Sequence, residues 1–338
     1  MKYPKFINSK SKISFIAPSL GAAIEPYKTR VIDAKKVLES LGHTVEYGPN
    51  TFGSYKALSA TKQDCANEVN HYFSDKDTEA IISVGGGELM YEVMSQVDFE
   101  NIKNNPKWFM GFSDNTNLTF LITTLCDTAS IYGPCAAQFG VSPWENSTLD
   151  AYKLLTNQTL TINSYDFYEK ESLRSEENIF ARYNLTEPSI KVKRPNQDLK
   201  FSGRLLGGCL DILTLFPGTK FDKVSEFIDK YQNDGIIWYL EACDLNVMGI
   251  RRAFDFLDNA GWFRNVKGFI IGRPLNGYEE IFGIDRFEAV EAVVKKYNVP
   301  IIFDMDLGHV AESVPLINGS FATVEAIGNN VKIQMELK

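Results

Sequence analysis

The feature that most constrains the fold is a regular alternation of short apolar runs with amphipathic stretches over the first 150 residues. The apolar runs predict strands at 13–18, 44–47, 80–84, 108–111 and 130–132, and helical periodicity predicts helices at 26–41, 61–73, 88–97 and 115–125. Strands separated by helices of this length form βαβ units, whose strands pair in parallel with helices on both faces. Residues 1–160 are therefore predicted to form an α/β domain built on a parallel sheet.

A second domain is predicted because 338 residues exceed one average domain and periodicity resumes near residue 199. Apolar runs and periodic stretches there predict strands at 200–206, 235–240, 266–271 and 300–304, helices at 248–259 and 286–296, and a terminal hairpin around 328–330. Residues 199–338 are thus expected to form a mixed α/β domain. The polar stretch 161–198 between the domains is interpreted as a linker with a long surface loop, in which Lys191, Lys193 and Arg194 are solvated.

Charge and cysteine content exclude several classes of protein. The net charge of -8 argues against a general nucleic-acid binder, which needs a basic surface. No run approaches the roughly 18 apolar residues of a membrane span, and the N-terminus shows no apolar signal region. The five cysteines are spread out, without a CxxC pair, so we expect a reducing compartment, hence the cytoplasm, and no structural zinc.

Ser113 lies in the segment WFMGFSDNT, which reads as strand, tight turn and helix. A side chain on such a turn projects from the carboxyl edge of the sheet, beside backbone N–H groups that can bind an oxyanion. Gly111 two residues earlier suits a nucleophile turn, although Asn115 replaces the second glycine of the G-x-S-x-G pattern. The alternative is that Ser113 or Asp114 simply caps the following helix.

Glu241 ends the apolar run GIIWYL and is therefore predicted to be buried. A buried carboxylate requires a partner. An ion pair with Arg251 or Arg252 would be structural, whereas a histidine partner would be oriented for catalysis.

Among the three histidines, His309 is the best placed for chemistry, because it follows a predicted strand in MDLGHVAES. His43 and His71 are expected at the surface. The triplet Gly85-Gly86-Gly87 follows another strand and could supply an oxyanion-binding amide or merely allow close packing. It matches no dinucleotide or P-loop pattern.

Several ordered segments resemble peptidase family S66, the LD-carboxypeptidases and the related microcin C7 self-immunity proteins. They are ISFIAPS, SVGGGELMYEVMSQVDFENIKNNPKWFMGFSDNTNL, SGRLLGGCLDILTLFPGT, IIWYLEACD, VKGFIIGRP and DMDLGHVAESVPLINGS. The resemblance spans nearly the whole chain. One departure is Cys209, which stands where the family usually has asparagine and which makes weaker hydrogen bonds.

The resemblance implies a catalytic triad of Ser113 as nucleophile, His309 as base and Glu241 as orienting acid. It implies an oxyanion hole formed by the backbone N–H of Asp114 with one from the turn of Gly86 and Gly87. It also implies a flavodoxin- or Rossmann-like N-terminal domain, a C-terminal domain with barrel-like β structure, a homodimer, and neither metal nor organic cofactor.

The long segment 166–198 resembles the microcin-immunity branch, in which an aromatic loop covers the leaving group. Phe167 and Phe180 are the substrate-loop candidates, with Tyr168 and Tyr183 nearby, and the alternative is that these rings only pack the loop down.

The expected function is that of a serine carboxypeptidase-type amidohydrolase that works through an acyl-enzyme. The substrate would be a small peptide or peptidyl-nucleotide, either a murein L,D-tetrapeptide or an aspartyl-nucleotide amide, and neither nucleic acid nor a membrane is expected as a partner. Two other interpretations remain open. One is a non-catalytic α/β module that binds a small molecule, and the other is a cysteine enzyme that uses Cys135 or Cys209.

Overall fold

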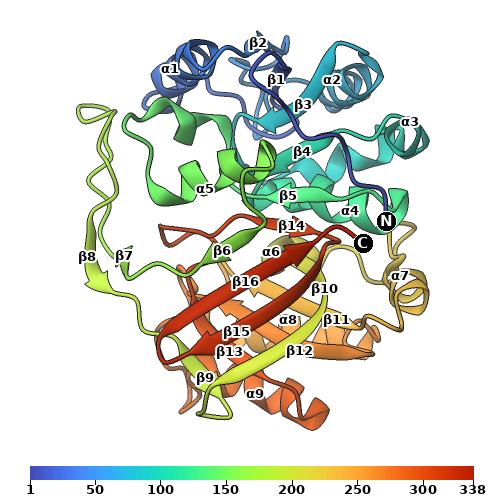
Figure 1. The fold of residues 1–338 in the computed structure, drawn as a ribbon, viewed down its shortest axis with the longest axis vertical. Helices are drawn as coiled ribbons and strands as arrows, with labels where there is room; N and C mark the ends of the chain where they lie inside the picture. The colour runs from blue at the N-terminus through green and yellow to red at the C-terminus, as the bar shows by residue number, and fades with distance from the viewer. The chain divides into compact units, whose positions relative to one another are not determined.

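The computed structural model describes all residues Met1–Lys338, and the chain divides into two compact units (Figure 1). The N-terminal unit comprises Met1–Leu160, Glu171–Asn184 and Pro315–Ile317. The C-terminal unit comprises Thr161–Lys170, Leu185–Val314 and Asn318–Lys338. Each unit is built around a β-sheet with helices against it, so the predicted α/β class is confirmed. No helix combines the length and hydropathy that a bilayer crossing requires.

The N-terminal unit contains a six-stranded sheet in the order β14-β5-β4-β3-β1-β2. Its strands are β1 (Lys12–Ile16), β2 (Thr44–Tyr47), β3 (Thr78–Ser83), β4 (Trp108–Gly111), β5 (Ser130–Tyr132) and β14 (Leu316–Asn318). The pairs β2–β1, β1–β3, β3–β4 and β4–β5 are all parallel, as the alternating pattern predicts. The carboxyl ends of these strands therefore lie along one edge, where ligands bind in open α/β sheets.

The helices of this unit are α1 (Tyr27–Ser40), α2 (Lys62–Ser74), α3 (Phe99–Asn104), α4 (Thr116–Cys126) and α5 (Asn146–Leu155). In α1 the buried side chains Val31, Ala34 and Leu38 recur at helical spacing, as predicted. In α2 the side chain of Thr61 caps the first turn by accepting the N–H of Asp64 at 3.2 Å. The helices α3 and α5 were not predicted, although the buried residues of α5 recur at helical spacing.

The helix predicted over 88–97 is wrong. The chain forms two 3-10 turns instead, η1 (Met90–Glu92) and η2 (Met94–Gln96). The backbone N–H of Met90 donates to the side chain of Asp114 at 3.0 Å rather than to a carbonyl one helical turn earlier. The following backbone hydrogen bonds, including Val93 N–H to Met90 O, join residues three apart, which is the tighter 3-10 pattern and not the four-residue spacing of an α-helix.

The C-terminal unit contains an eight-stranded mixed sheet in the order β6-β16-β15-β10-β11-β12-β13-β9. The strands are β6 (Thr161–Asn163), β9 (Val192–Arg194), β10 (Leu199–Cys209), β11 (Ile236–Glu241), β12 (Val266–Gly272), β13 (Ile301–Met305), β15 (Phe321–Ile327) and β16 (Asn330–Glu336). Strands β10 to β13 are parallel, and β15, β16, β6 and β9 join antiparallel. The predicted terminal hairpin is confirmed as β15 and β16.

Helices α6 (Leu210–Leu213), α7 (Val224–Lys230), α8 (Val247–Asn259) and α9 (Arg286–Val294) complete this unit. The buried face of α8 includes Ile250, Phe254 and Leu257 at helical spacing. The rings of Trp238 in β11 and Trp262 after α8 stack with centroids 5.7 Å apart, and both are fully buried. Burial of such side chains contributes about 1.5–3 kcal/mol each, which fixes β11 against the helical layer.

Strand β10 runs three residues beyond its predicted end at 206. Gly207 and Gly208 continue the strand and pair in parallel with Tyr239 and Leu240 of β11. A Cβ on Gly207 would lie 1.7 Å from the carbonyl oxygen of Tyr239, so glycine permits the close approach of the two strands. In the same register Cys209 pairs with Glu241, which brings the last residues of both strands together.

The segment between the domains is less irregular than predicted. It contains β6, β9 and a two-stranded antiparallel ribbon of β7 (Phe167–Glu169) and β8 (Leu185–Pro188). The tip of that ribbon, Glu171–Asn184, belongs to the N-terminal unit. There Arg182 forms a bidentate pair with Glu145 at 2.8 and 2.7 Å, and Arg30 donates to the carbonyl oxygen of Ala181 at 3.1 Å.

The prediction of a solvated basic cluster at Lys191, Lys193 and Arg194 is wrong. These residues form or precede the edge strand β9, and the ammonium group of Lys191 lies 2.8 Å from the carboxylate of Asp306. Both side chains are at most 1% exposed. A buried lysine needs such a partner, and Asp306 on the distant β13 end is not visible from local charge patterning.

Candidate active site

Ser113 occupies the turn between β4 and α4 in the N-terminal unit, inside the 3-10 turn η3 (Ser113–Asn115). Its φ of +62° lies in the left-handed region, which is uncommon for a non-glycine residue and often marks a functional turn. The N–H of Ser113 donates to the hydroxyl of Tyr132 at 3.2 Å. Neither η3 nor α4 has a side-chain N-cap, so the capping interpretation of Ser113 and Asp114 is not supported.

The side chain of Asp114 links the Ser113 turn by hydrogen bonds to the segments that follow β1 and β3. Its carboxylate accepts hydrogen bonds from the Ser19 hydroxyl at 2.5 Å, from the Met90 N–H at 3.0 Å and from the Asn117 amide at 2.9 Å. Asp114 is 1% exposed, and burial raises the pKa of its carboxyl group. Ser19 was missed in the sequence, although a polar residue just beyond the β1 strand is the signal that could have identified it.

The glycine triplet after β3 passes directly against the Ser113 side chain. A Cβ on Gly86 would lie 3.1 Å from the Ser113 Cβ and 3.2 Å from its Oγ, and a Cβ on Gly87 would lie 2.0 Å from the Ser19 Oγ. The Asn115 amide donates to the carbonyl oxygen of Gly85 at 2.8 Å. No protein acceptor takes the backbone N–H of Gly86, Gly87 or Asp114.

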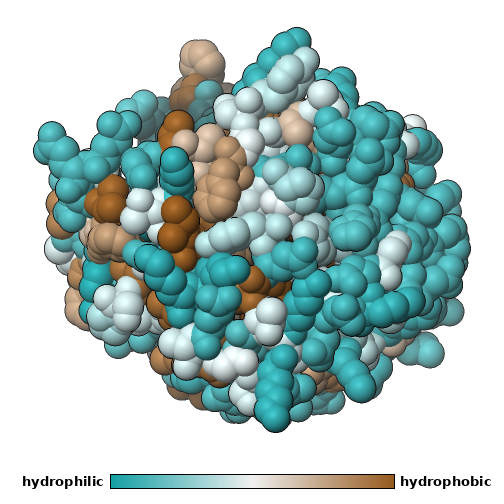
Figure 2. All heavy atoms as spheres, turned by 90° about the horizontal axis from the view of Figure 1, so that it is seen from above, coloured by the Kyte–Doolittle hydropathy of each residue, from teal (hydrophilic) through white to brown (hydrophobic).

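Some apolar side chains close to this turn are exposed. Leu20, which follows Ser19, and Leu89, two residues after Gly87, are 39% and 38% exposed. The face of the molecule in Figure 2 is mainly hydrophilic, and the hydrophobic atoms on it gather on one side instead of being spread evenly. The Ser113 turn therefore combines a half-buried serine with backbone donors that no protein acceptor takes and with apolar neighbours.

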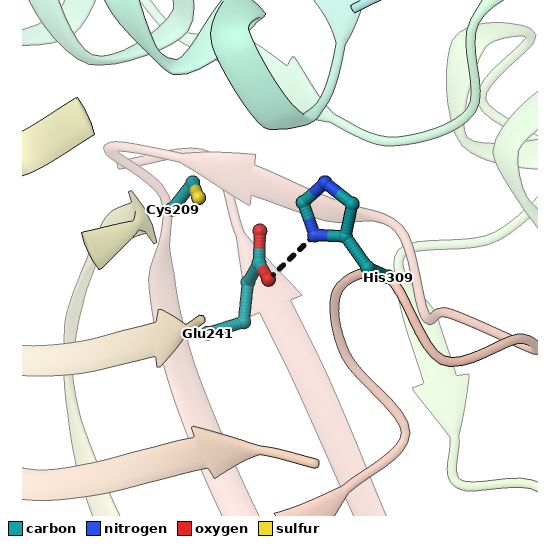
Figure 3. A group of neighbouring side chains, drawn as sticks. All are labelled: Cys209, Glu241 and His309. Atoms are coloured by element: carbon teal, nitrogen blue, oxygen red, sulfur yellow. Dashed lines mark hydrogen bonds and ion pairs between the residues drawn. The ribbon is translucent and has the colours of Figure 1, made fainter. Parts of the chain in front are cut away.

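Glu241 and His309 meet in the C-terminal unit. Nδ1 of His309 and Oε2 of Glu241 are 2.8 Å apart (Figure 3). Glu241 is 1% exposed at the end of β11, whereas the His309 side chain is 14% exposed. The partner of the buried carboxylate is thus the histidine, and neither Arg251 nor Arg252 takes that place.

The backbone of Gly308, whose φ is +104°, packs directly against the side chain of Glu241. A Cβ there would lie 2.5 Å from Oε2 of Glu241, and a Cβ on Gly272 would lie 2.8 Å from the Glu241 Cβ. Glycine at these two positions gives the carboxylate room to reach the imidazole.

The electrostatic surroundings of His309 favour its protonated form. Burial by itself lowers the pKa of His309, but the carboxylate of Glu241 and the side chain of Cys243 outweigh it and raise that pKa above its ordinary value. A histidine that donates from Nδ1 to a carboxylate keeps Nε2 available for proton transfer and is stabilised once it accepts a proton. The pair can therefore act as a base with a fixed orientation.

Cys209 lies beside this pair (Figure 3). Its Sγ and the nearest ligand atoms of Glu241 and His309 are all within 4.8 Å of one another, and the Sγ is 3.4 Å from the carboxylate of Asp211. Burial raises the pKa of the Cys209 thiol well above its ordinary value, and it raises the pKa of Cys135 to about 12. Neither thiol is activated as a nucleophile, which disfavours the cysteine-enzyme interpretation.

The two remaining histidines do not join the site. His71 is exposed, as predicted, but His43 is only 4% exposed, so its predicted surface position is wrong. Its Nε2 is 2.9 Å from the hydroxyl of Tyr152, on the unpredicted helix α5 that covers it.

The aromatic candidates of the ribbon are divided between the units. Phe167 on β7 is 49% exposed, and Phe180 in the tip is 45% exposed. The ring of Tyr168 packs on the guanidinium of Arg273 at 4.1 Å, and that of Tyr183 lies 5.4 Å from the guanidinium of Arg174. The rings of the two phenylalanines are about half exposed to solvent, whereas each tyrosine ring packs near an arginine guanidinium.

Relatives of this chain include proteins named as carboxypeptidases and a self-immunity protein. A putative carboxypeptidase of Vibrio cholerae is 25% identical over 99% of this chain and 98% of its own length. The microcin C7 self-immunity protein MccF of Escherichia coli is 26% identical over 95% and 92%. A probable murein peptide carboxypeptidase of Bacillus subtilis is 24% identical over 98% and 94%.

Solved structures share the fold at lower identity. An MccF-like protein from Bacillus anthracis is 21% identical with a TM-score of 0.81, covering 99% of this chain and 100% of that one. MccF in complex with aspartyl sulfamoyl adenosine is also 21% identical with a TM-score of 0.81, covering 98% of both chains.

Two family models match the chain in the expected order. The LD-carboxypeptidase N-terminal domain matches residues 13–133, which contain the Ser113 turn, and the LD-carboxypeptidase C-terminal domain matches residues 202–324, which contain Glu241 and His309. This chain therefore belongs to the LD-carboxypeptidase family, peptidase family S66, and is an enzyme of the serine-peptidase type.

Proposed function

We propose that the enzyme hydrolyses an amide next to a free carboxyl group, with Ser113 as nucleophile, His309 as general base and Glu241 as the carboxylate that orients it. The observation that carries the proposal is the 2.8 Å contact between the buried Glu241 and the partly exposed His309. A serine hydroxyl is a weak nucleophile at neutral pH and needs a base held in this way. The non-catalytic binding module would not require this pairing.

In the proposed mechanism the Ser113 Oγ attacks the amide carbonyl carbon while its proton passes to Nε2 of His309. The oxyanion accepts hydrogen bonds from the N–H of Asp114 and from Gly86 or Gly87. The carbon–nitrogen bond then breaks, and His309 returns the proton to the leaving amine. Water, deprotonated by His309, next hydrolyses the acyl-enzyme and releases Ser113. The mechanism requires Ser113 and His309 to reach the same scissile amide.

The substrate we propose first is an aspartyl-nucleotide amide. Support comes from the relative MccF, whose structures include complexes with aspartyl sulfamoyl adenosine and glutamyl sulfamoyl guanosine. The half-exposed rings of Phe167 and Phe180 would stack on the nucleobase. A murein L,D-tetrapeptide is the second candidate, because the Bacillus subtilis relative with almost the same identity is named a murein peptide carboxypeptidase.

The cellular setting is also part of the proposal. All five cysteines are unpaired, which supports a reducing compartment such as the cytoplasm. There the enzyme would act as a homodimer, either in antibiotic self-immunity or in peptidoglycan recycling, according to its substrate.

The test is a paired hydrolysis assay with an aspartyl sulfamoyl nucleoside and with a murein tetrapeptide that ends in D-alanine. We expect one of them to be cleaved, and Ser113→Ala and His309→Ala each to lower kcat by three or more orders of magnitude. Ser54→Ala and His71→Ala, which alter exposed residues, are matched controls and should retain activity. If both substrates remain intact, or if Ser113→Ala cleaves as fast as the control, the proposed function is wrong.

A further inference from the structure

The three side chains in Figure 3 form a cluster of possible metal ligands, of which the proposed reaction uses Glu241 and His309 but not Cys209. The parallel register of β10 and β11 pairs Cys209 with Glu241, and the close approach at Gly207 keeps the two strand ends together. Gly308 then brings His309 to the same carboxylate. One sulfur and one carboxylate from the ends of β10 and β11 thus converge with an imidazole from the loop after β13.

The spacing of these ligand atoms suits a small divalent ion. Zinc binds cysteine sulfur at about 2.3 Å and histidine nitrogen or carboxylate oxygen at about 2.0–2.2 Å, which places tetrahedral ligands roughly 3.5 Å apart. The atoms of Cys209, Glu241 and His309 already lie within 4.8 Å of one another. Side-chain adjustments of about 1 Å would close the site, and three protein ligands leave a fourth position for water.

The charges around the cluster also favour a cation. The carboxylates of Glu241 and Asp211 place negative charge near the Cys209 sulfur, and His309 would give up any proton on its ligating nitrogen as the ion binds. Asp211 accepts the thiol at 3.4 Å and is held in place by the backbone N–H groups of Cys243 and Asp244 at 3.0 and 2.9 Å. A divalent ion would compensate this negative charge and release the thiol proton to solvent as the Cys209 sulfur binds.

We propose that Cys209, Glu241 and His309 form an inhibitory site for a thiophilic divalent cation of the Zn²⁺ class. The ion would bind the carboxylate of Glu241 and a ring nitrogen of His309 in place of the hydrogen bond between them. Since both groups would then be ligands, His309 could no longer take up a proton. The inhibitory consequence rests on the proposed function, whereas the binding itself does not.

Binding is tested with Co²⁺ on the full-length protein, because a cysteine thiolate bound to Co²⁺ gives a near-ultraviolet charge-transfer absorption band. We expect a band that saturates at one equivalent and that added Zn²⁺ removes. Cys209→Ser and His309→Ala should each lower the band at least fivefold, whereas Cys126→Ser, which alters a buried thiol of the N-terminal unit, should retain it. Circular dichroism checks that each variant is folded, above all His309→Ala, which leaves the buried Glu241 carboxylate without its imidazole partner.

The proposal is overturned if wild type gives no band, or if Cys209→Ser retains it. Loss of the band in Cys243→Ser with retention in Cys209→Ser would likewise overturn it, because the partly exposed neighbouring thiol would then be the ligand.

Activity provides an independent second measurement. Micromolar Zn²⁺ should inhibit wild type, a chelator should restore the activity, and Cys209→Ser should need at least tenfold more Zn²⁺ for half-inhibition of its own activity. If no substrate is cleaved but the Co²⁺ band appears, the proposed function fails and the metal site stands. If substrate is cleaved and Zn²⁺ neither binds nor inhibits, the metal site fails and the proposed function stands.

Discussion

At the scale of single residues, the site depends on charges and glycines that leave few substitutions neutral. The carboxylate of Glu241 is buried and has the imidazole of His309 as its partner, and it raises the pKa of that imidazole against the opposing effect of burial. An uncompensated buried carboxylate costs several kcal/mol, so the pair has structural as well as chemical consequences.

Replacing Glu241 by glutamine should lower the pKa of His309, because the neutral amide no longer stabilises the imidazolium. In wild type the acid limb of kcat/KM should lie above pH 6.5, the ordinary histidine value, since His309 must lose its proton to act as a base. Glu241→Gln should move that limb to lower pH and reduce kcat by up to about 10⁴-fold. NMR titration of the His309 ring protons checks the shift, and an unchanged pKa in the variant would contradict it.

The raised pKa of His309 also predicts the direction in which the free energy of unfolding changes with pH. Because the folded-state pKa of His309 is raised above its unfolded value, the pair's contribution is complete below about pH 6.5 and is lost as the pH rises through the raised value. The difference in unfolding free energy between wild type and Glu241→Gln should therefore shrink on the alkaline side. Denaturant titrations at several pH values measure this difference.

Gly308→Ala should damage the site more than it damages the fold. The new Cβ would lie 2.5 Å from Oε2 of Glu241 and would push the carboxylate away from His309. Gly261→Ala is a matched control, because Gly261 also has a positive φ, +79°, but no atom lies within 4 Å of its added Cβ. Both variants should lose about 1 kcal/mol from backbone strain, and only Gly308→Ala should lose tenfold or more in kcat. Equal activity losses would show that strain alone matters.

At the scale of elements, strands with continuous apolar runs could be predicted from the sequence almost to the residue. β2, β4 and β5 have the predicted bounds; β4 and β5 are buried along their whole length, whereas the edge strand β2 is only partly buried. The 3-10 turns η1 and η2 were not predicted, because the apolar residues of this segment fit helical periodicity and the segment's contact with the distant Asp114 side chain is not visible in the local sequence.

The candidate site could be predicted residue by residue but not as a geometry. Ser113, Glu241 and His309 each stand just after an apolar strand, which a sequence displays directly. The hydrogen bond between Glu241 and His309, and the burial of Cys209 beside them, depend on the register of β10 with β11 and on the loop that carries Gly308. Pairings of that kind join residues far apart in the chain, and no local pattern records them.

Gly207→Ala tests how β10 and β11 position these residues. The added Cβ would lie 1.7 Å from the Tyr239 carbonyl oxygen, so the strands must separate, at a cost of about 1–3 kcal/mol or more. Gly203→Ala, on the same strand, meets its neighbours at 3.1 Å or more and should cost less. Chemical denaturation should rank Gly207→Ala as the less stable variant. The reverse order would mean that the close strand approach does not determine the stability.

At the scale of the whole molecule, the chain does not complete one unit before it begins the other. The N-terminal unit takes its tip segment Glu171–Asn184 and the residues Pro315–Ile317 from later parts of the chain. Leu316 and Ile317 of this segment lie in β14, an edge strand beside β5 in the six-stranded sheet. The tip supplies Arg182 to Glu145, whose side chain is only 9% exposed. Integrity of the first sheet therefore depends on residues encoded after the second has begun.

This arrangement predicts that a fragment of Met1–Leu160 is much less stable than its parallel sheet suggests. The fragment lacks β14, so β5 becomes an unprotected edge, and Glu145 loses its bidentate partner Arg182. We expect the fragment to aggregate or to unfold without a sharp thermal transition, whereas the full chain unfolds cooperatively. A bicistronic partner fragment of Thr161–Lys338 should restore the transition by supplying both missing segments. If Met1–Leu160 alone melts as sharply as the full chain, those segments contribute little, and the first unit is complete before residue 161.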